Sequence, residues 1–335
     1  MEQLSENYKY QGAVHIHSSY SDGSGDIKSI AISAKKAGLS WIIITDHNNL
    51  DASEGIIEDV YVLKGEEISP KENNHYIVLG IDKLIPPSEN CQDNINAVRL
   101  NNGFGFAAHP DESESRNNNF KPIKWTDKNN IPDGVEIWNW FSQFADNYNS
   151  KNIFSVIYAY LFKNNLVKKP YPETISWWDT LNNQTENIVP AIGGIDAHAL
   201  KYSKYLIPVT IFPYKDMFGT IINEINLSEP LSKDFETAKK QIFNALKLGN
   251  NIIVNKSVYD VIPKIYTSYE DGDKYLNIEC GKISDIKIFA NGTEISSCKA
   301  KSFKLQLVQA GKYRVEVEIN AKGFAYSNPI IIKEV

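Results

Sequence analysis

Cysteine and arginine are scarce in this chain of 335 residues. The three cysteines, Cys91, Cys280 and Cys298, stand far apart and form no CxxC pair, which argues against a zinc site built from cysteines. Cys280 and Cys298 could pair with each other, but buried free thiols are the favoured expectation. Any metal site must therefore be built from other side chains.

Long apolar runs are also missing. No stretch approaches the roughly 18 apolar residues that span a bilayer, and the N-terminal residues MEQLSENYKYQG contain no apolar core of a signal peptide. We therefore expect a cytoplasmic protein with no membrane partner. The net charge of −6 repels phosphate backbones, so strong binding of duplex nucleic acid is not expected. An anionic substrate would need cations to attract it, and bound metal ions would serve.

The apolar patterning divides the chain near residue 260. Before that point short apolar runs alternate with helical patterns, and a run such as SWIIIT (40–45) is typical of a strand buried on both faces. Repeated strand–helix units favour parallel strands in an α/β barrel-like architecture. The expected strands cover 13–17, 40–45, 61–69, 75–80, 104–109, 133–139 and 188–196, and the expected helices cover 26–39, the end of a helix at 95–103, a stretch near 142–183, and 236–250.

After about residue 262 apolar and polar residues alternate, as in YLNIEC and YRVEVEI, and turn signals such as EDGD and NGT separate the runs. This pattern predicts a small antiparallel β-sandwich, Ig-like in size, with a separate hydrophobic core. We therefore expect two domains, residues 1–260 and 261–335. The second domain contains no histidine, so it should add stability, a partner surface or a pocket wall, but no metal ligand.

Each of the six histidines lies at an end of an apolar run. Five occur in the segments HIHSSYSDG (15–23), TDHN (45–48), AAHP (107–110) and GIDAHA (194–199), and His75 follows GEEIS (65–69). Strand geometry would place His15 and His17 on one face, and barrels gather catalytic groups at the carboxyl ends of their strands. A lone histidine at a strand end is usually a packing or capping residue. Five such ends, with carboxylates nearby, predict a site for zinc, manganese or iron.

These motifs, in this order, resemble those of the PHP superfamily, named for polymerase and histidinol phosphatase. The resemblance covers roughly residues 10–255. It implies a distorted (β/α)7 TIM-like barrel, the PHP fold, with a trinuclear metal centre. Glu67 is preferred to Glu66 because it directly precedes Ile-Ser, as in the family pattern, and Asp22 stands where some relatives have histidine. By resemblance, the first metal would be held by His15, His17, Glu67 and Asp196, the second by Glu67, His75 and His109, and the third by Asp22, His47 and His198.

EIWN (136–139), GIDAHA and the tail AYSNPIIIK (325–333) further resemble the CehA/McbA-like branch, which includes predicted phosphoesterases and enzymes that cut carbamate or amide bonds. The resemblance implies a hydrolase with two to three divalent transition-metal ions, Mn, Fe or Zn. Such cations lower the pKa of a bound water from about 15.7 towards 7, which yields hydroxide at neutral pH. We expect hydrolysis of a small-molecule or nucleotide phosphate ester. A carbamate or amide-type hydrolase, a 3′-5′ exonuclease on short oligonucleotides, and a non-catalytic metal-binding module are the alternatives.

Three more residues are candidates for the reaction itself. Asp46 in TDHN would orient a ligand imidazole, or it would cap a helix. Arg116 follows AHP and could clamp a phosphate with two hydrogen bonds, although DESESRNNN also has the composition of a solvated loop. Asn139, in the aromatic run WNWF, could help to wall a pocket for a planar or sugar group.

Overall fold

Seven strands close a barrel in the computed structural model, which describes residues 8–113, 121–148, 158–159, 161–202 and 209–333. The order around the barrel is β1–β2–β4–β5–β6–β7–β8, and β8 returns to pair with β1. This is the distorted barrel expected from the sequence, and all seven expected strands are present. They are β1 (Tyr8–Ile16), β2 (Trp41–Ile44), β4 (Val60–Ile68), β5 (Tyr76–Leu79), β6 (Phe104–Ala107), β7 (Gly134–Asn139) and β8 (Ala191–Ala197).

Strand β5 runs antiparallel to both of its neighbours, whereas the other barrel pairs are parallel. The chain between β4 and β5 consists only of residues 69–75. A parallel connection needs a crossover of about a dozen residues or more, so this short loop forces a hairpin. The expectation of parallel strands is therefore wrong at β5.

Among the residues that the structure describes, helices cover only part of the barrel. The chain starts two of them with capping aspartates, because Asp26 and Asp234 accept hydrogen bonds from the backbone N–H of Ser29 and Thr237. The helical stretch expected near 142–183 is divided by a 3-10 turn at Lys163–Asn165. The helices are α1 (Ile27–Lys36), α2 (Cys91–Leu100), α3 (Trp140–Asn147), α5 (Pro172–Gln184), α6 (Tyr214–Met217) and α7 (Phe235–Lys247). Within the described ranges, none of the helices has the length and apolarity to cross a membrane.

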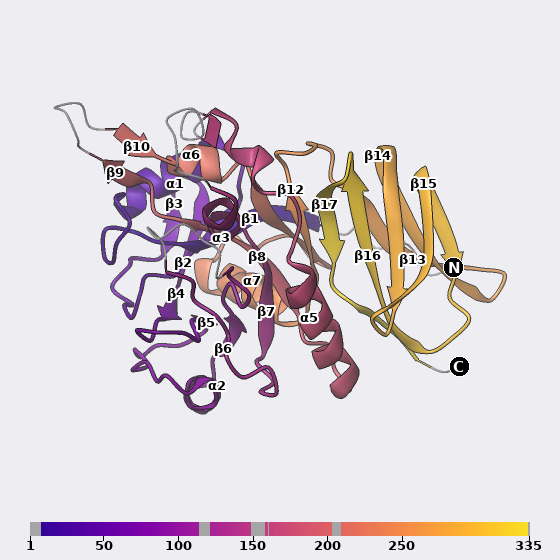
Figure 1. Ribbon diagram of the computed structural model, residues 1–335, viewed down its shortest axis with the longest axis horizontal. Helices are drawn as coiled ribbons and strands as arrows, with labels where there is room; N and C mark the ends of the chain where they lie inside the picture. The colour runs from indigo at the N-terminus through magenta and orange to yellow at the C-terminus, as the bar shows by residue number, and fades with distance from the viewer. Residues whose placement is uncertain (1–7, 114–120, 149–157, 160, 203–208, 334–335) are drawn as a thin grey trace.

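Further strands lie outside the barrel. On its outer side β11 (Ile221–Leu227) pairs with β1, β12 (Asn251–Asn255) pairs with β11, and β17 (Lys322–Ser327) pairs with β12, all antiparallel. Figure 1 shows the C-terminal strands standing beside the barrel, with β17 nearest to it. The chain thus has a β-rich second part, as expected. The remaining strands are β3 (Gly55–Ile57), β9 (Leu200–Tyr202), β10 (Val209–Ile211), β13 (Lys264–Glu270), β14 (Asp273–Ala290), β15 (Thr293–Gln306), β16 (Gly311–Ile319) and β18 (Ile330–Ile332).

The C-terminal strands share a hydrophobic core with the barrel. One cluster of buried apolar side chains contains Ile286 and Phe324 together with Ile253 and Trp138. The rings of Trp138 and Tyr326 meet edge to face, with centroids 5.5 Å apart. The separate core expected for the C-terminal part is therefore wrong, because its strands continue the hydrogen-bonded ladder of the barrel.

An ion pair also joins the two parts. Arg314 of β16 donates hydrogen bonds of 2.7 Å from Nε and Nη2 to the two carboxylate oxygens of Asp179 in α5. The guanidinium lies 3.9 Å from the ring centroid of Phe289. Such a two-point contact fixes geometry as well as charge. All three cysteines are free. Cys91 and Cys280 are buried, as expected, whereas Cys298 is partly exposed.

Asparagine amides bind backbone groups along the edge of β8, among them Asn251, whose Nδ2 donates to the carbonyl oxygen of Ala191 at 3.1 Å. Strand β1 pairs only with the carboxyl-end half of β8. Beyond it, the Asn223 amide accepts a hydrogen bond from the N–H of Gly193 (3.0 Å) and donates one to its carbonyl oxygen (2.7 Å). Asn328, in the C-terminal part, does the same for Ala191, at 2.6 and 3.1 Å. These side chains satisfy backbone groups that a neighbouring strand would otherwise bind.

Candidate metal centre

The candidate ligands meet at the carboxyl-end rim of the barrel. Strands β1, β2, β4, β6 and β8 all end at this rim. His75 precedes β5, and because β5 is reversed its amino end lies at the same rim. Asp22 lies in the loop between β1 and α1. The ligands at the ends of parallel strands are His15 and His17, His47, Glu67, His109, and Asp196 and His198.

The ligand atoms form four overlapping groups, each with all atoms within 4.8 Å of one another. Two of the groups share His17, which the family resemblance gave to the first metal alone. Two also share His47. The groups are His15, Glu67 and His109; His15, His17 and Asp196; His47, Glu67 and His75; and His17, Asp22, His47 and His198.

Glu67 lies at the middle of this cluster. Its Oε2 is 3.3 Å from Nε2 of both His15 and His17, and its Oε1 is 2.8 Å from Nδ1 of His75. Glu66 is also buried but points elsewhere, because its Oε2 accepts a hydrogen bond from the backbone N–H of Ile85 at 3.1 Å. Burial raises the pKa of Glu66 to about 7. The geometry therefore places Glu67, and not Glu66, among the candidate ligands.

Several atoms at the centre are buried without a hydrogen-bond partner among the described residues. They are Nε2 of His15, both ring nitrogens of His17 and Oε2 of Glu67. Buried polar atoms are nearly always satisfied, and unpaired imidazole nitrogens beside carboxylates form the donor set that suits Zn, Mn and Fe. The residues present therefore fit divalent transition-metal ions.

The carboxylates of the centre are ionised at neutral pH. Burial acts to raise the pKa of Glu67, but the neighbouring His47 and His15 outweigh it and hold that pKa well below its usual range. At Asp22 burial is likewise outweighed, first by the hydrogen bond from His198, and the pKa falls to about 2. Ionised carboxylates are the form that binds metal.

The histidines of the centre differ in protonation state. Burial, together with the nearby His198 and His47, lowers the pKa of His17 to about 4, so its ring is neutral and able to bind metal. At His47 burial acts in the same direction, but the charge of Glu67 outweighs it and raises the pKa to about 9. Metal binding at neutral pH would therefore displace a proton from His47.

The centre is deep at one side and open at the other. The side chains of His15 and His17 are fully buried, whereas that of Asp22 is 56% exposed and that of His47 is 28% exposed. The ring of Phe141 lies 5.8 Å from that of His198. A substrate would therefore reach the centre past Asp22 and His47.

Three candidate ligands have a strained backbone. His15, His109 and Asp196 have φ values of 66°, 28° and 52°, in the left-handed region that side chains with a Cβ seldom adopt. The register of β1 against β8 also shifts between Val14 and Ile16. The rings of His15 and His17 do lie together, as expected, with centroids 5.2 Å apart, but the strand between them is irregular. Strain of this kind clusters at functional sites.

Asp46 holds the loop that carries Asp22. Its carboxylate accepts hydrogen bonds from the backbone N–H of Ser18 (2.7 Å) and from the hydroxyls of Ser18 (2.6 Å) and Ser21 (2.5 Å). Among the described contacts of Asp46 no imidazole occurs, and residues 46–50 form no helix. The structure thus gives Asp46 neither role expected from the sequence.

Asn139 lies beside the centre but is buried. Its Oδ1 accepts a hydrogen bond from the N–H of Ser142 (2.8 Å) at the start of α3, and its Nδ2 donates to Oε2 of Glu136 (3.1 Å). It is only 3% exposed, so it does not form the pocket wall that was expected. Arg116 lies outside the described residues.

Sequence reasoning missed the groups that orient the ligand rings. Oε1 of Glu136 is 2.8 Å from Nδ1 of His15, and the hydroxyl of Ser69 is 2.6 Å from Nδ1 of His47. The role of Glu136 could have been suspected from its place inside the apolar run GVEIWN, because a carboxylate is seldom buried without a partner. The partner could not be identified, since His15 is 121 residues away in the chain.

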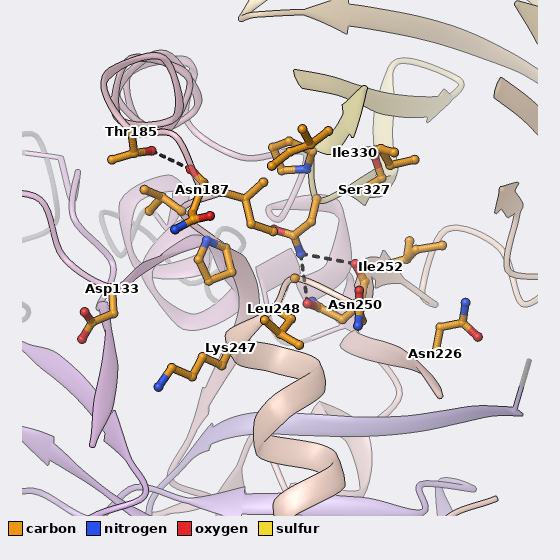
Figure 2. Close-up of a pocket in the computed structure, with 18 of the residues that line it drawn as sticks. Asp133, Thr185, Asn187, Asn226, Lys247, Leu248, Asn250, Ile252, Ser327 and Ile330 are labelled. Atoms are coloured by element: carbon orange, nitrogen blue, oxygen red, sulfur yellow. Dashed lines mark hydrogen bonds between the residues drawn. The ribbon is translucent and has the colours of Figure 1, made fainter. Parts of the chain in front are cut away.

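A groove of about 1140 Å³ lies at the opposite end of the barrel. It borders the residues that precede β7 and β8 and the loop after β17. Figure 2 shows Asp133 and Lys247 on one side of it and Ser327 and Ile330 across from them. Two of its cations are engaged, Lys9 with Glu224 and Arg99 with Asp133. Because the groove lies at the amino ends of β7 and β8, it is distinct from the candidate metal centre at the carboxyl-end rim.

Comparison with known proteins supplies the family. The sequence model of the PHP domain matches residues 13–199, which include all nine candidate ligands. No curated protein shows a significant match. Two solved structures are similar at low identity. A two-domain protein from Bacteroides vulgatus, described as containing a predicted PHP-like metal-dependent phosphoesterase, has 14% identity and a TM-score of 0.46 over 97% of this chain and 96% of its own. PsfC from Pseudomonas syringae has 12% identity and a TM-score of 0.43 over 68% and 87%.

The family match covers more than half of the chain and coincides with the closed barrel and its cluster of histidines and carboxylates. This chain therefore belongs to the PHP domain family.

Proposed function

We propose that the chain is a metal-dependent phosphoesterase that hydrolyses a small-molecule or nucleotide phosphate ester at a trinuclear metal centre. One observation carries the proposal. Six histidines and three carboxylates from six separate stretches of the chain converge at one rim, and their innermost nitrogen and oxygen atoms are buried with no partner among the described residues. Packing alone does not account for such unpaired atoms.

In this proposal, which follows the family resemblance, the residues would divide among three metal positions. His15, His17, Glu67 and Asp196 would hold the first ion, Glu67, His75 and His109 the second, and Asp22, His47 and His198 the third. When bound, such ions lower the pKa of water so that hydroxide is available at neutral pH. The chain itself contributes the fixed geometry, because Ser69 and Glu136 orient the rings that bear the donor atoms.

An anionic substrate suits the open side of the centre. The chain carries a net charge of −6, so only a local excess of cations would attract an anion. Three divalent ions would outweigh the three ligand carboxylates and provide that excess. Phe141 beside His198 offers an apolar surface for the remainder of a small substrate.

The test is a hydrolase screen on protein that has been stripped of metal and reconstituted with Mn, Zn or Fe. The substrates are p-nitrophenyl phosphate, bis-p-nitrophenyl phosphate, a set of nucleotides and a set of aryl carbamates. We expect turnover of a phosphate ester, its loss with EDTA, and two to three bound ions per chain by elemental analysis.

The screen separates the alternatives. Turnover of carbamates without phosphate esters would show the carbamate or amide-type hydrolase that uses the same ligands, and would contradict the phosphoesterase proposal. A chain that carries no transition metal, and takes up none on reconstitution, would contradict the metal centre itself.

A further inference from the structure

The carboxylate of Glu136 is held on three sides. It is 1% exposed. Its Oε1 lies 2.8 Å from Nδ1 of His15, and its Oε2 accepts hydrogen bonds from the backbone N–H of His109 (2.7 Å) and from Nδ2 of Asn139 (3.1 Å). One buried carboxylate from β7 thus contacts residues at the ends of β1 and β6.

The orientation of Asn139 is fixed by a separate contact. Because its Oδ1 caps helix α3 through the N–H of Ser142 at 2.8 Å, its Nδ2 must face Glu136. A backbone N–H is always a donor. Oε2 of Glu136 therefore faces two obligatory donors, and Oε1 faces Nδ1 of His15. Nδ2 of Asn139 also lies 3.4 Å from that Nδ1, but the 2.8 Å contact with Oε1 of Glu136 is much the shorter, so the Nδ1 proton is directed to the carboxylate.

The backbone leaves room for the carboxylate at one glycine. A Cβ added to Gly194 of β8 would lie 1.7 Å from Oε1 of Glu136. Any side chain at this position would displace the carboxylate from the ring of His15. The chain therefore has a glycine where the backbone of β8 comes close to the carboxylate of Glu136.

We propose that Glu136 is a positioning residue that fixes the tautomer of His15, so that Nδ1 carries the proton and Nε2 is free to bind metal. Nε2 of His15 is buried, has no hydrogen-bond partner among the described residues, and lies 3.3 Å from Oε2 of Glu67 and 3.5 Å from Oδ1 of Asp196. The inference rests on the proposed metal centre. Histidine ligands generally donate their second N–H to such a partner, which fixes the ring.

Glutamine at position 136 tests the role sharply. Its single oxygen must accept from His109 and Asn139, so its NH2 group would face Nδ1 of His15. Two donors cannot face each other, so Nδ1 would give up its proton and Nε2 would carry it. The Glu136→Gln variant keeps the size of the side chain but favours the tautomer that cannot bind metal.

The experiment titrates metal-free protein with Mn2+ by calorimetry, with circular dichroism to check the fold. We expect Glu136→Gln to weaken the tightest binding by about 10- to 100-fold. Gly194→Ala should weaken it as well, because its Cβ would lie 1.7 Å from Oε1 of Glu136 and 3.0 Å from the Cβ of His15. Glu66→Gln is the matched control, because Glu66 is also buried and accepts a backbone N–H but touches no ligand ring. Its Mn2+ affinity should stay at the wild-type value.

A measurement on the unaltered protein covers the case in which both variants fail to fold. The 15N spectrum of zinc-loaded wild type should show His15 protonated at Nδ1 and bound through Nε2. Protonation at Nε2, or wild-type Mn2+ affinity in a folded Glu136→Gln variant, would overturn the inference. If the protein binds metal as expected but hydrolyses none of the screened substrates, the proposed function fails while the role of Glu136 stands. A wild-type chain that binds no metal would overturn both.

Discussion

Glu67 has a carboxylate oxygen within 3.3 Å of a ring nitrogen of five of the six histidines, and we expect it to matter most. Glu67→Ala should remove more than one ion per chain and reduce turnover beyond the roughly 10- to 100-fold that follows loss of an orienting partner. His75→Ala should remove at most one ion, because His75 belongs to only one of the four ligand groups. Elemental analysis and steady-state kinetics on both variants give the comparison. Equal metal content in the two would show that Glu67 does not bridge.

Glu66 should affect stability instead of metal content. Its folded-state pKa of about 7 lies above the usual value of 4.5, so the unfolded chain loses this proton at lower pH than the folded chain. The burial cost is therefore absent below about pH 4.5 and grows as pH rises to 7, reaching about 3 kcal/mol. Glu66→Gln cannot ionise. In metal-free protein we expect the variant to gain stability over wild type between pH 5 and 8, as measured by urea denaturation. A pH-independent difference would contradict the assigned pKa.

The motifs in the sequence, through their resemblance to the PHP superfamily, named nine candidate ligands, and the structure brings all nine together at one rim. The partners of those ligands were not identified. Glu136 and Ser69 are ordinary residues of strand and loop, and only the closed barrel brings them to a ring nitrogen. Asp46 was misread because its partners, Ser18 and Ser21, lie on a different loop.

The loop between β1 and α1 places Asp22 at the open side. Gly23 makes this possible, since a Cβ there would lie 2.2 Å from the carbonyl oxygen of His17. Gly23→Ala should therefore shift the loop, cost about 1–3 kcal/mol of stability, and weaken the metal position that includes Asp22 while the deeper positions keep their ions. Metal content and thermal unfolding measure both effects.

Gly219→Ala is the control for that substitution. The nearest atom to a Cβ there is the carbonyl oxygen of Asp216 at 3.5 Å, an ordinary contact. This variant should match wild type in stability and in metal content. If Gly23→Ala also matched wild type, the close approach of the loop to His17 would not matter for Asp22.

The positions of the helices and strands could be predicted well from local sequence. The directions of the strands could be predicted less well. Buried strands were readable as apolar runs, and α1 and α7 as helical patterns. The aspartates that cap these two helices were recognised only in the structure. To predict the reversal of β5, the length of the loop before it must be considered, because parallel pairing requires a crossover of about a dozen residues. The shared core of the C-terminal strands was hidden, because alternation along a strand does not tell which surface covers its apolar face.

Truncation after Val261 tests how the two parts of the molecule depend on each other. The cut removes β17, the hydrogen-bonded partner of β12, and exposes Trp138, which packs against Tyr326. It also removes Asn328 from the edge of β8. We expect the shortened chain to aggregate or to lose native circular dichroism, because a bare strand edge and a buried aromatic surface would face water. A folded truncated chain that keeps its metal would show that the barrel is complete without these strands.

The amide of Asn328 has a consequence for the order in which the molecule is made. It binds Ala191 across 137 residues of chain. This part of the β8 edge therefore lacks the Asn328 amide long after the last histidine has left the ribosome. Contacts so distant in sequence form late and slow folding. During synthesis all six histidines would thus be present while the edge of β8 still lacks the amide of Asn328, so the scaffold that fixes the candidate ligands is completed only after Asn328 has emerged.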